Sequence, residues 1–525
     1  MTKTNKITAY CIKDNVNKND ILKEPMQSVE LYGGTLYYKR KEVSSPSWVK
    51  DFFGDDHGIK NIFKVASAQA VYVKSIKIDN IEKNFAISFG TGHHLLNKSS
   101  IVSNFGLKAV LNIIDENNIK KIDTHNISSV PKHKSEQVTK LGDLQEFSLN
   151  YETDILMGIS AGINKNKEPA LYGIFGTNVT GKDSLAVNIK FDAGSIDDFL
   201  QKAYEFANSQ QYKQKGFGWI DNIRRISKDD VLLSSLNEKL CADLKNLDEA
   251  EDKIWIAVPE IIKWEDIKGF RYKNIDNKEL VQELSLKDLG QELSCDTLQK
   301  IRIQAIGAYK DEAIHDWSAL ECLYAETTLN NKIYMYINSN WYQIDSDFEK
   351  ETENKFQQII NKPLPVVPWA DYVGQKENDY NKELANNIKG AVCMDANNIL
   401  HGGGHSKIEF CDVFDIQNSN IIHVKKYAGS AVLSHLFNQG YVSATLLKND
   451  KCFKNNVTAE IRKAIPDFEF TDQQYNIIYG ILRKKTAGNS DNLPFFSKVT
   501  LISIASLINN MKGYEAFIKI IYTKQ

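Results

Sequence analysis

The segment 407–447, KIEFCDVFDIQNSNIIHVKKYAGSAVLSHLFNQGYVSATLL, constrains the fold more than any other part of the chain. Two apolar runs, 407–414 and 421–427, flank the polar sequence QNSN, whose residue types favour a turn. Beyond them, apolar residues recur at helical spacing over 430–447, with Ser430 placed to cap the helix. The sequence therefore predicts a β-hairpin followed directly by an amphipathic helix.

The two apolar runs contain the ionisable residues Glu409, Asp412, His423 and Lys425. Burying such groups costs free energy unless they are paired or bind a metal. Because side chains alternate along a strand, His423 and Lys425 share a face, while Glu409 lies opposite to Asp412. We expect Asp412, His423 and Lys425 on one face, with helix 430–447 beside them. Glu409 joins this group only if a β-bulge shifts the register between it and Asp412.

A shared metal ion would fix one distance in this group. If Asp412 and His423 bind the same ion at about 2 Å each, the carboxylate and the ring lie roughly 3–5 Å apart.

The composition is that of a soluble globular protein, with 42% hydrophobic and 25% charged residues. A chain of 525 residues exceeds one ordinary core, so two or three domains are expected. The formal net charge is -2, so any nucleic-acid contact must come from a local basic patch.

Cysteine usage indicates a reducing cytoplasm. The seven cysteines form no CxxC pair, so neither a structural zinc site nor a disulfide framework is expected. The N-terminus has no apolar leader, and no run approaches the ~18 apolar residues of a membrane span. The cysteines are Cys11, Cys241, Cys295, Cys322, Cys393, Cys411 and Cys452.

A proline-rich stretch at 361–371, NKPLPVVPWAD, favours extended chain and marks a boundary. We predict an α+β and α/β protein of several domains. They are an N-terminal α+β region over 1–190, a middle mixed α/β region over 191–362, a Pro-rich linker at 363–378 and a C-terminal α/β domain over 379–525. Within the first region, the apolar run 105–114 is interpreted as a strand.

The C-terminal region begins with a predicted helix at 380–388 and a strand with its exit at 391–400. The flexible turn HGGGH at 401–405, the hairpin and its helix follow. Further along, the sequence predicts a strand at 475–482, a helix at 495–511 and a last strand at 514–521.

This order, with Asp412 and Lys425 on the hairpin, resembles the core of the PD-(D/E)xK nuclease superfamily. The resemblance implies a mixed-sheet, restriction-endonuclease-like domain that binds Mg²⁺ through an acidic residue on the second strand and (E/D)xK on the third. Asp412 matches the acidic position and Lys425 the lysine. His423 stands where the family usually has Glu or Asp.

That departure changes the expected ligand set. Asp412, His423 and Glu409 are the candidate metal ligands, and Glu383 is a further source of a carboxylate. Mg²⁺ or Mn²⁺ is the expected cofactor, although imidazole is a poor ligand for Mg²⁺. The cation and Lys425 would together stabilise the extra negative charge of a phosphoryl transition state.

The end of the hairpin and the helix 430–447 supply the remaining candidates. Gln439 is the fourth candidate catalytic residue, and Lys426, Ser430 and His435 are candidate substrate contacts. The same residues also fit structural roles, with Lys426 solvated and Gln439 and His435 bonded to the hairpin beneath them.

Basic residues gather over 421–463 and at 483–485, as a binder of the phosphate backbone requires, although a solvated lysine-rich surface has the same pattern. They are Lys425, Lys426, Lys448, Lys451, Lys454, Arg462, Lys463 and the cluster Arg483-Lys484-Lys485, against Asp450 and Glu460.

From near residue 85 to its end, the chain is similar to a sporadically distributed bacterial family of unknown function. The matching stretches include FGTGHHLL, IEFCDVF and LPFFSKVTL. The patchy distribution implies mobile-element, anti-phage or toxin-like roles. We expect a cytoplasmic metal-dependent nuclease that cleaves DNA or RNA, with a regulatory partner or a second copy of the chain. The alternative is a non-catalytic sensor of nucleic acid or of a phage protein, built on a degenerate nuclease fold.

Overall fold

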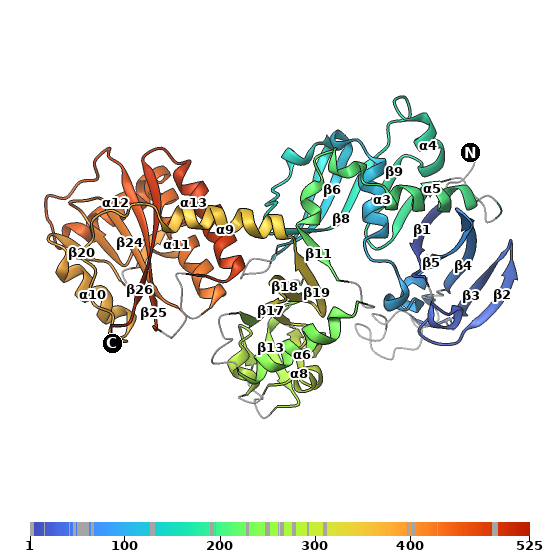
Figure 1. Cartoon of the computed structure of the whole chain (residues 1–525), viewed down its shortest axis with the longest axis horizontal. Helices are drawn as coiled ribbons and strands as arrows, with labels where there is room; N and C mark the ends of the chain where they lie inside the picture. The colour runs from blue at the N-terminus through green and yellow to red at the C-terminus, as the bar shows by residue number, and fades with distance from the viewer. Residues whose placement is uncertain are drawn as a thin grey trace. The chain divides into compact units, whose positions relative to one another are not determined.

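The structure is a computed structural model of the whole chain (Figure 1). The residues that it describes are 5–14, 16–40, 43–45, 49, 62–64, 68–126, 132–189, 194, 196–226, 230–246, 253–260, 262, 267–275, 280–290, 293–307, 312–395, 398–401, 406–427, 429–485 and 492–524.

The chain forms two compact units of mixed helix and sheet. The first comprises Met1–Asn126 and His133–Asp221, and the second includes Asn222–Gln525. The boundary expected near residue 190 lies inside the first unit, and the proline-rich stretch expected to divide the chain lies inside the second.

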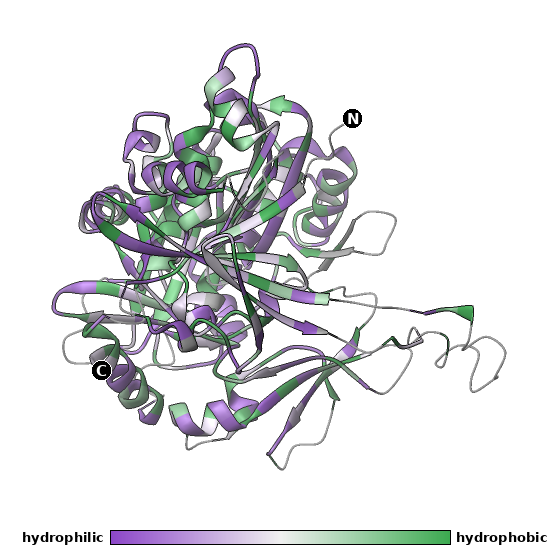
Figure 2. Cartoon of the chain, turned by 90° about the vertical axis from the view of Figure 1, so that its right-hand side faces the viewer, coloured by the Kyte–Doolittle hydropathy of each residue, from purple (hydrophilic) through white to green (hydrophobic). Residues whose placement is uncertain are grey.

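The first unit is built on one ten-stranded sheet, in the order β2-β3-β4-β5-β1-β10-β9-β8-β6-β7, whose neighbouring pairs from β2 to β6 are antiparallel. Figure 2 shows that hydrophobic and hydrophilic residues are interspersed along the strands of the chain. The strands are β1 (Asn5–Cys11), β2 (Gln27–Leu31), β3 (Gly34–Arg40), β4 (Ala68–Ile78), β5 (Ile81–Gly90), β6 (Ile119–Asn126), β7 (Lys132–Gly142), β8 (Asp154–Gly162), β9 (Asn178–Gly181) and β10 (Leu185–Ile189). The helices are α3 (Phe105–Ile113), α4 (Pro169–Phe175) and α5 (Asp197–Asn208).

The strand expected at 105–114 is wrong, because this segment forms α3. All its residues except Lys108 are buried, so the apolar run lacks the amphipathic period that would have distinguished a helix from a buried strand. Gly106 allows close packing: a Cβ atom there would lie 1.9 Å from the backbone oxygen of Ser184. The helix therefore sits against the backbone of the sheet.

The second unit begins with two antiparallel sheets. In the five-stranded sheet, ordered β11-β19-β18-β17-β12, β18 and β19 form a hairpin. Its turn residues Asn338 and Ser339 have φ of 46° and 58°, as a two-residue type I′ turn requires. Its strands are β11 (Ile223–Arg225), β12 (Ile254–Ile256), β17 (Leu323–Leu329), β18 (Lys332–Ile337) and β19 (Asn340–Ile344). The other sheet contains β13 (Ile267–Lys273), β14 (Leu280–Val281), β15 (Arg302–Gly307) and β16 (Ala313–Ser318), and the helices are α6 (Leu232–Lys245) and α8 (Cys295–Lys300).

The C-terminal part of this unit has a mixed sheet in the order β20-β23-β24-β25-β26. The first three strands are antiparallel, whereas β24, β25 and β26 are parallel. The strands of this part are β20 (Ala391–Cys393), β21 (Asn398–His401), β22 (Ser406–Glu409), β23 (Val413–Asp415), β24 (Asn420–Lys426), β25 (Tyr475–Arg483) and β26 (Tyr514–Tyr522). The helices are α9 (Ser346–Ile360), α10 (Glu377–Asn387), α11 (Ser430–Asn449), α12 (Lys451–Arg462) and α13 (Phe495–Asn509).

Both faces of this sheet are covered by helices. Tyr380 and Leu384 of α10 pack in one core with Ile422 and Val424 of β24. On the other face, α11 and α13 pack in a second core that includes Ile421. Parallel strands buried on both faces have nearly continuous apolar sequences, as YNIIYGILR in β25 does. The helices and strands predicted from residue 475 onwards are confirmed.

The strand expected at 407–414 is wrong in one respect: it is broken at residues 410–412. Its first part, β22, pairs with β21 in a separate two-stranded sheet, and its second part, β23, pairs with β24. Residues 402–405 of the expected HGGGH turn lie outside the described residues.

The cap of the following helix also differs. The N-cap of α11 is Gly429, with φ of 99°, and not Ser430, whose hydroxyl instead lies 3.0 Å from that of Ser497.

Two structural findings bear on the expectations from composition. Among the helices of the described residues, none is long and apolar enough to cross a membrane. One disulfide joins Cys241 to Cys295, a pairing that the sequence did not indicate, while the other five cysteines are free.

Candidate metal centre

Three carboxylates converge at the start of β23. The side chains of Asp395, Glu409 and Asp412 each offer an oxygen, and these oxygens all lie within 4.8 Å of one another. The backbone explains the convergence, because the carbonyl of Asp412 accepts the N–H groups of Met394 at 2.8 Å and of Asp395 at 3.1 Å. The segment after β20 is thereby held beside the break in the hairpin.

Asp412 is the most buried of the three, with 8% of its surface exposed. Burial raises the pKa of its carboxyl well above the ordinary value, against the opposing effect of the hydrogen bond from Val424 N–H to Oδ2 at 2.7 Å. The nearby carboxylates of Glu409, Asp395 and Glu377 raise the pKa further. The group therefore holds negative charge that needs a proton or a cation to offset it.

This donor set fits a hard divalent cation, because Mg²⁺ and Mn²⁺ prefer carboxylate and carbonyl oxygens. A fourth oxygen lies near. Asn381 of α10 is fully buried and donates from Nδ2 to Oδ2 of Asp395 at 3.2 Å. Its own Oδ1 is buried and has no hydrogen-bond partner within the described part of the chain. A cation or its bound water at this position would satisfy that oxygen.

Lys425 is engaged by a further carboxylate. Its Nζ lies 2.6 Å from Oε1 of Glu377, in the first turn of α10, and Oε2 of Glu377 accepts the Lys426 N–H at 2.9 Å. Burial alone would lower the pKa of Lys425, but Glu377, with Asp412 and Glu409, raises it above the ordinary value. Lys425 is therefore a fixed cation beside the carboxylate group.

His423 lies in a different environment. It is 2% exposed, and its Nε2 is 3.3 Å from the hydroxyl of Ser443 on α11. Burial lowers the pKa of the ring to about 3, so His423 is neutral near pH 7. The group of metal-binding side chains found among the described residues does not contain His423. It does contain Glu409, which was expected to join only through a β-bulge; the strand is instead broken at 410–412, and β22 and β23 belong to different sheets.

The other predicted residues are spread more widely. Gln439 lies next to the group, with Nε2 donating to Oε2 of Glu409 at 3.3 Å. His435 is exposed on α11, and Lys426 is exposed at the end of β24. Ser430 is buried, and Glu383 is exposed on α10, where it accepts a hydrogen bond from Gln375.

Sequence reasoning missed Asp395, Glu377 and Asn381. The only local signals were an acidic residue two positions after the short strand β20 and an acidic first turn in α10. Neither signal places these side chains beside a hairpin that follows later in the chain.

Comparisons with known proteins identify a family without assigning a chemistry. Residues 5–522 match the model of a family of unknown function, DUF6119, and the chain belongs to this family. No curated protein and no solved structure matches the chain.

Proposed function

We propose that this protein is a metal-dependent nuclease, acting in anti-phage defence or as a toxin, with its active site at Asp395, Glu409 and Asp412. The observation that carries the proposal is the convergence of these carboxylates beside the cation of Lys425. Oxygen ligands next to a fixed positive charge suit a reaction that builds negative charge on a phosphoryl group.

The topology supports the same reading. A helix, α10, precedes three antiparallel strands, β20, β23 and β24, with the β21–β22 pair inserted between β20 and β23, and α11 and α12 then lead to the parallel strand β25. This order agrees with the nuclease core that the sequence resembles. The resemblance assigns Asp412 to the acidic position, although Asp412 directly precedes β23 and does not lie within it, and assigns Lys425 of β24 to the lysine.

Each residue then has a definable task. A bound Mg²⁺ or Mn²⁺ would polarise the phosphoryl group and activate water. Asp395, Glu409 and Asp412 would hold the cation, and Asn381 orients Asp395 through their hydrogen bond. Lys425 donates to a phosphate oxygen. Gln439 fixes the Glu409 carboxylate through its own hydrogen bond.

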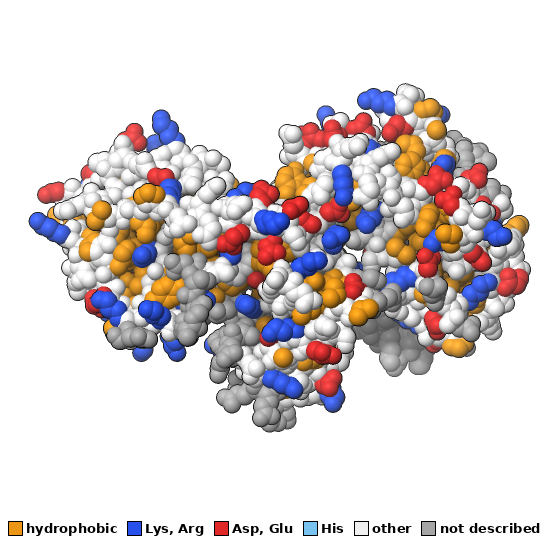
Figure 3. Space-filling view, in the orientation of Figure 1, with side chains coloured by type: hydrophobic (Ala, Val, Ile, Leu, Met, Phe, Trp, Pro, Cys, Tyr) orange, Lys and Arg blue, Asp and Glu red, His pale blue; other side chains and the backbone are white. Residues whose placement is uncertain are grey.

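The surface charge limits how a nucleic acid can bind. On the face shown in Figure 3, basic and acidic side chains are interspersed. Two of the basic residues expected to contact phosphates are paired, Arg462 with Glu469 and Lys463 with Glu460. Binding therefore depends on local contacts and is expected to weaken steeply with salt.

The test is cleavage of DNA and RNA, each single- and double-stranded, with Mg²⁺ or Mn²⁺. We expect Asp412→Asn and Lys425→Met each to lower the cleavage rate at least about 100-fold, because each removes a group that stabilises transition-state charge. Asp379→Asn is the matched control, since Asp379 is exposed in the first turn of α10 and should leave the rate unchanged. Equal rates in all four proteins would remove these residues from the mechanism.

His423 favours a second candidate function, a sensor without catalysis. The position that carries a carboxylate in active nucleases is here a buried neutral imidazole that contacts Ser443. Calorimetric titration with Mn²⁺ separates the two functions. Nucleic-acid binding without any heat of Mn²⁺ binding would favour the sensor.

A further inference from the structure

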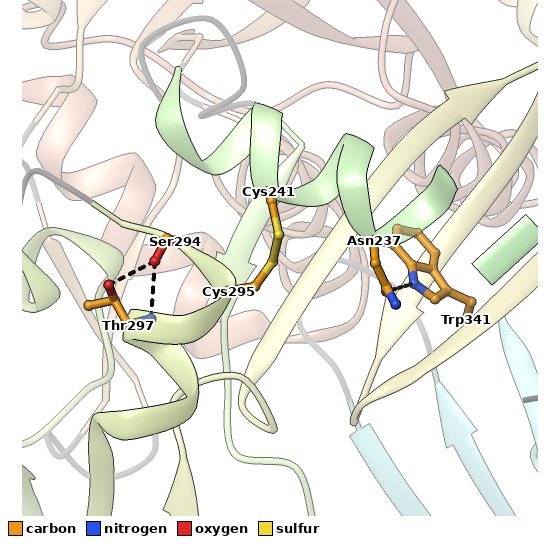
Figure 4. Close-up of a disulfide and its surroundings, with 6 residues drawn as sticks. All are labelled: Asn237, Cys241, Ser294, Cys295, Thr297 and Trp341. Atoms are coloured by element: carbon orange, nitrogen blue, oxygen red, sulfur yellow. Dashed lines mark hydrogen bonds between the residues drawn. A yellow bond between two sulfur atoms is a disulfide. The ribbon is translucent and has the colours of Figure 1, made fainter. Parts of the chain in front are cut away.

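The disulfide of the second unit connects two different sheets. Cys241 lies on α6 and Cys295 on α8, 54 positions apart in sequence, with Cα atoms 5.6 Å apart (Figure 4). Helix α6 is tied to the five-stranded sheet, because Asn237 Oδ1 accepts the indole N–H of Trp341 at 2.9 Å. Helix α8 directly precedes β15 of the four-stranded sheet. The disulfide therefore connects the two sheets covalently through α6 and α8.

The pairing is selective. The other five cysteines are free thiols: Cys11, Cys322 and Cys411 are buried, Cys393 is half-buried and Cys452 is exposed. Small domains stabilised by a disulfide framework pair most of their cysteines. One bond among many free thiols is instead the pattern of a disulfide that forms and opens while the rest of the chain stays reduced.

The bond is also accessible. Cys241 lines a cavity of about 570 Å³ together with Ser234, Glu238 and Lys245, among others. Cys241 and Cys295 both line a second cavity of about 380 Å³, which contains Trp341. An incoming thiol can reach Cys241 from the first cavity without unfolding the protein. Buried structural disulfides lack such access and resist exchange.

We propose that Cys241 and Cys295 form a reversible thiol–disulfide exchange site whose reaction partner is a low-molecular-weight thiol. The thiolate of this molecule attacks Sγ of Cys241, forming a mixed disulfide and releasing Cys295 as a thiolate that takes up a proton. A second molecule of thiol attacks the mixed disulfide and releases Cys241. The sum is one protein disulfide and two thiols giving two protein thiols and one small disulfide. This inference does not depend on the proposed nuclease activity.

Trp341 provides an internal reporter of the exchange. Asn237, which holds its indole N–H, lies one helical turn before Cys241 on α6, and Trp341 lines the same cavity as both cysteines (Figure 4). Opening the bond frees α6 from α8 next to this indole. The fluorescence of Trp341 should therefore follow the redox state.

The experiment equilibrates the folded full-length protein with mixtures of reduced and oxidised glutathione, and then traps free thiols by alkylation. The expected result is a reversible gain of two alkylated cysteines, mapped by mass spectrometry to Cys241 and Cys295, as the glutathione becomes more reduced. A matching change in tryptophan fluorescence should disappear in Trp341→Phe. Cys241→Ser should lose the response, while Cys452→Ser, which removes the exposed free thiol, should keep it.

Either of two results would overturn the proposal. The bond could persist at every glutathione ratio until the protein unfolds, which would make it structural. Alternatively, the two thiols could stay reduced at every ratio. Because the alkylation readout uses the wild-type chain, a folding defect in Cys241→Ser would leave the test intact.

Discussion

Asp412→Asn is expected to stabilise the metal-free protein and to abolish its stabilisation by Mg²⁺ or Mn²⁺. Asparagine can keep the hydrogen bond from Val424 N–H while removing a carboxylate crowded by Glu409 and Asp395. The wild-type protein should gain about 2.7 kcal/mol at a cation concentration 100 times its Kd, which the variant should lack. The measurement is the thermal unfolding midpoint, Tm, with and without cation.

The difference in stability between the wild type and Asp412→Asn should depend on pH in a defined direction. The pKa of Asp412 is higher in the folded protein than its unfolded value of about 3.9. Its contribution to stability is thus fully present below about pH 4 and is lost as the pH rises towards the folded pKa. The metal-free wild type should become less stable over this range relative to Asp412→Asn, and the benefit of added cation should grow.

Asp379→Asn is again the control, and it should behave as the wild type does. A cation-dependent rise in Tm that Asp412→Asn retains in full would place the metal elsewhere. The stability difference between Asp412→Asn and the wild type should change with pH. A constant difference would contradict the explanation that neighbouring carboxylates destabilise ionised Asp412.

Gly106→Ala is expected to destabilise the first unit by about 3 kcal/mol or more, because overpacking against backbone cannot be relieved by a rotamer change. The added Cβ would lie 1.9 Å from Ser184 O and 2.5 Å from Leu185 N, both backbone atoms of the segment that enters β10. Either α3 must move away from the sheet or the end of β10 must shift. The measurement is the denaturant midpoint of unfolding.

A second glycine in a helix isolates this steric effect. Gly173 lies in α4, and a Cβ atom there would have nothing within 4 Å. Gly173→Ala should therefore stabilise the protein by about 0.5–1 kcal/mol through the lower entropy of its unfolded chain. Equal effects of the two substitutions would show that α3 packs less closely than its geometry indicates.

The sequence predicted the elements whose apolar period is clear. The strand β24, the helix α11 and the later elements β25, α13 and β26 agree with the expected segments. The helix α3 was missed because burial on nearly all sides removes its amphipathic period. The break at 410–412 was also missed, since the run 407–414 contains neither glycine nor proline and so gives no local sign of interruption.

Only the part of the candidate site that comes from the hairpin and its following helix could be predicted from the sequence. Asp412, Lys425 and Gln439 were singled out as polar groups in buried or amphipathic segments. Asp395 and Glu377 come from earlier segments, and their positions depend on tertiary hydrogen bonds to Asp412 O and from Lys425. The contact of His423 with Ser443 depends on how α11 packs, which no strand period can specify.

If the protein binds nucleic acid as proposed, the ion pair between Lys425 and Glu377 has a consequence for the affinity. A phosphate that approaches Lys425 would compete with the Glu377 carboxylate, and the apparent Kd would then be the intrinsic Kd divided by the fraction of molecules in which the lysine is released. Glu377→Gln should thus tighten nucleic-acid binding measured without added cation, by fluorescence anisotropy. Unchanged or weaker binding would mean that Lys425 does not meet the phosphate. In the proposed nuclease, Glu377 would thus limit the affinity for the substrate without contacting it.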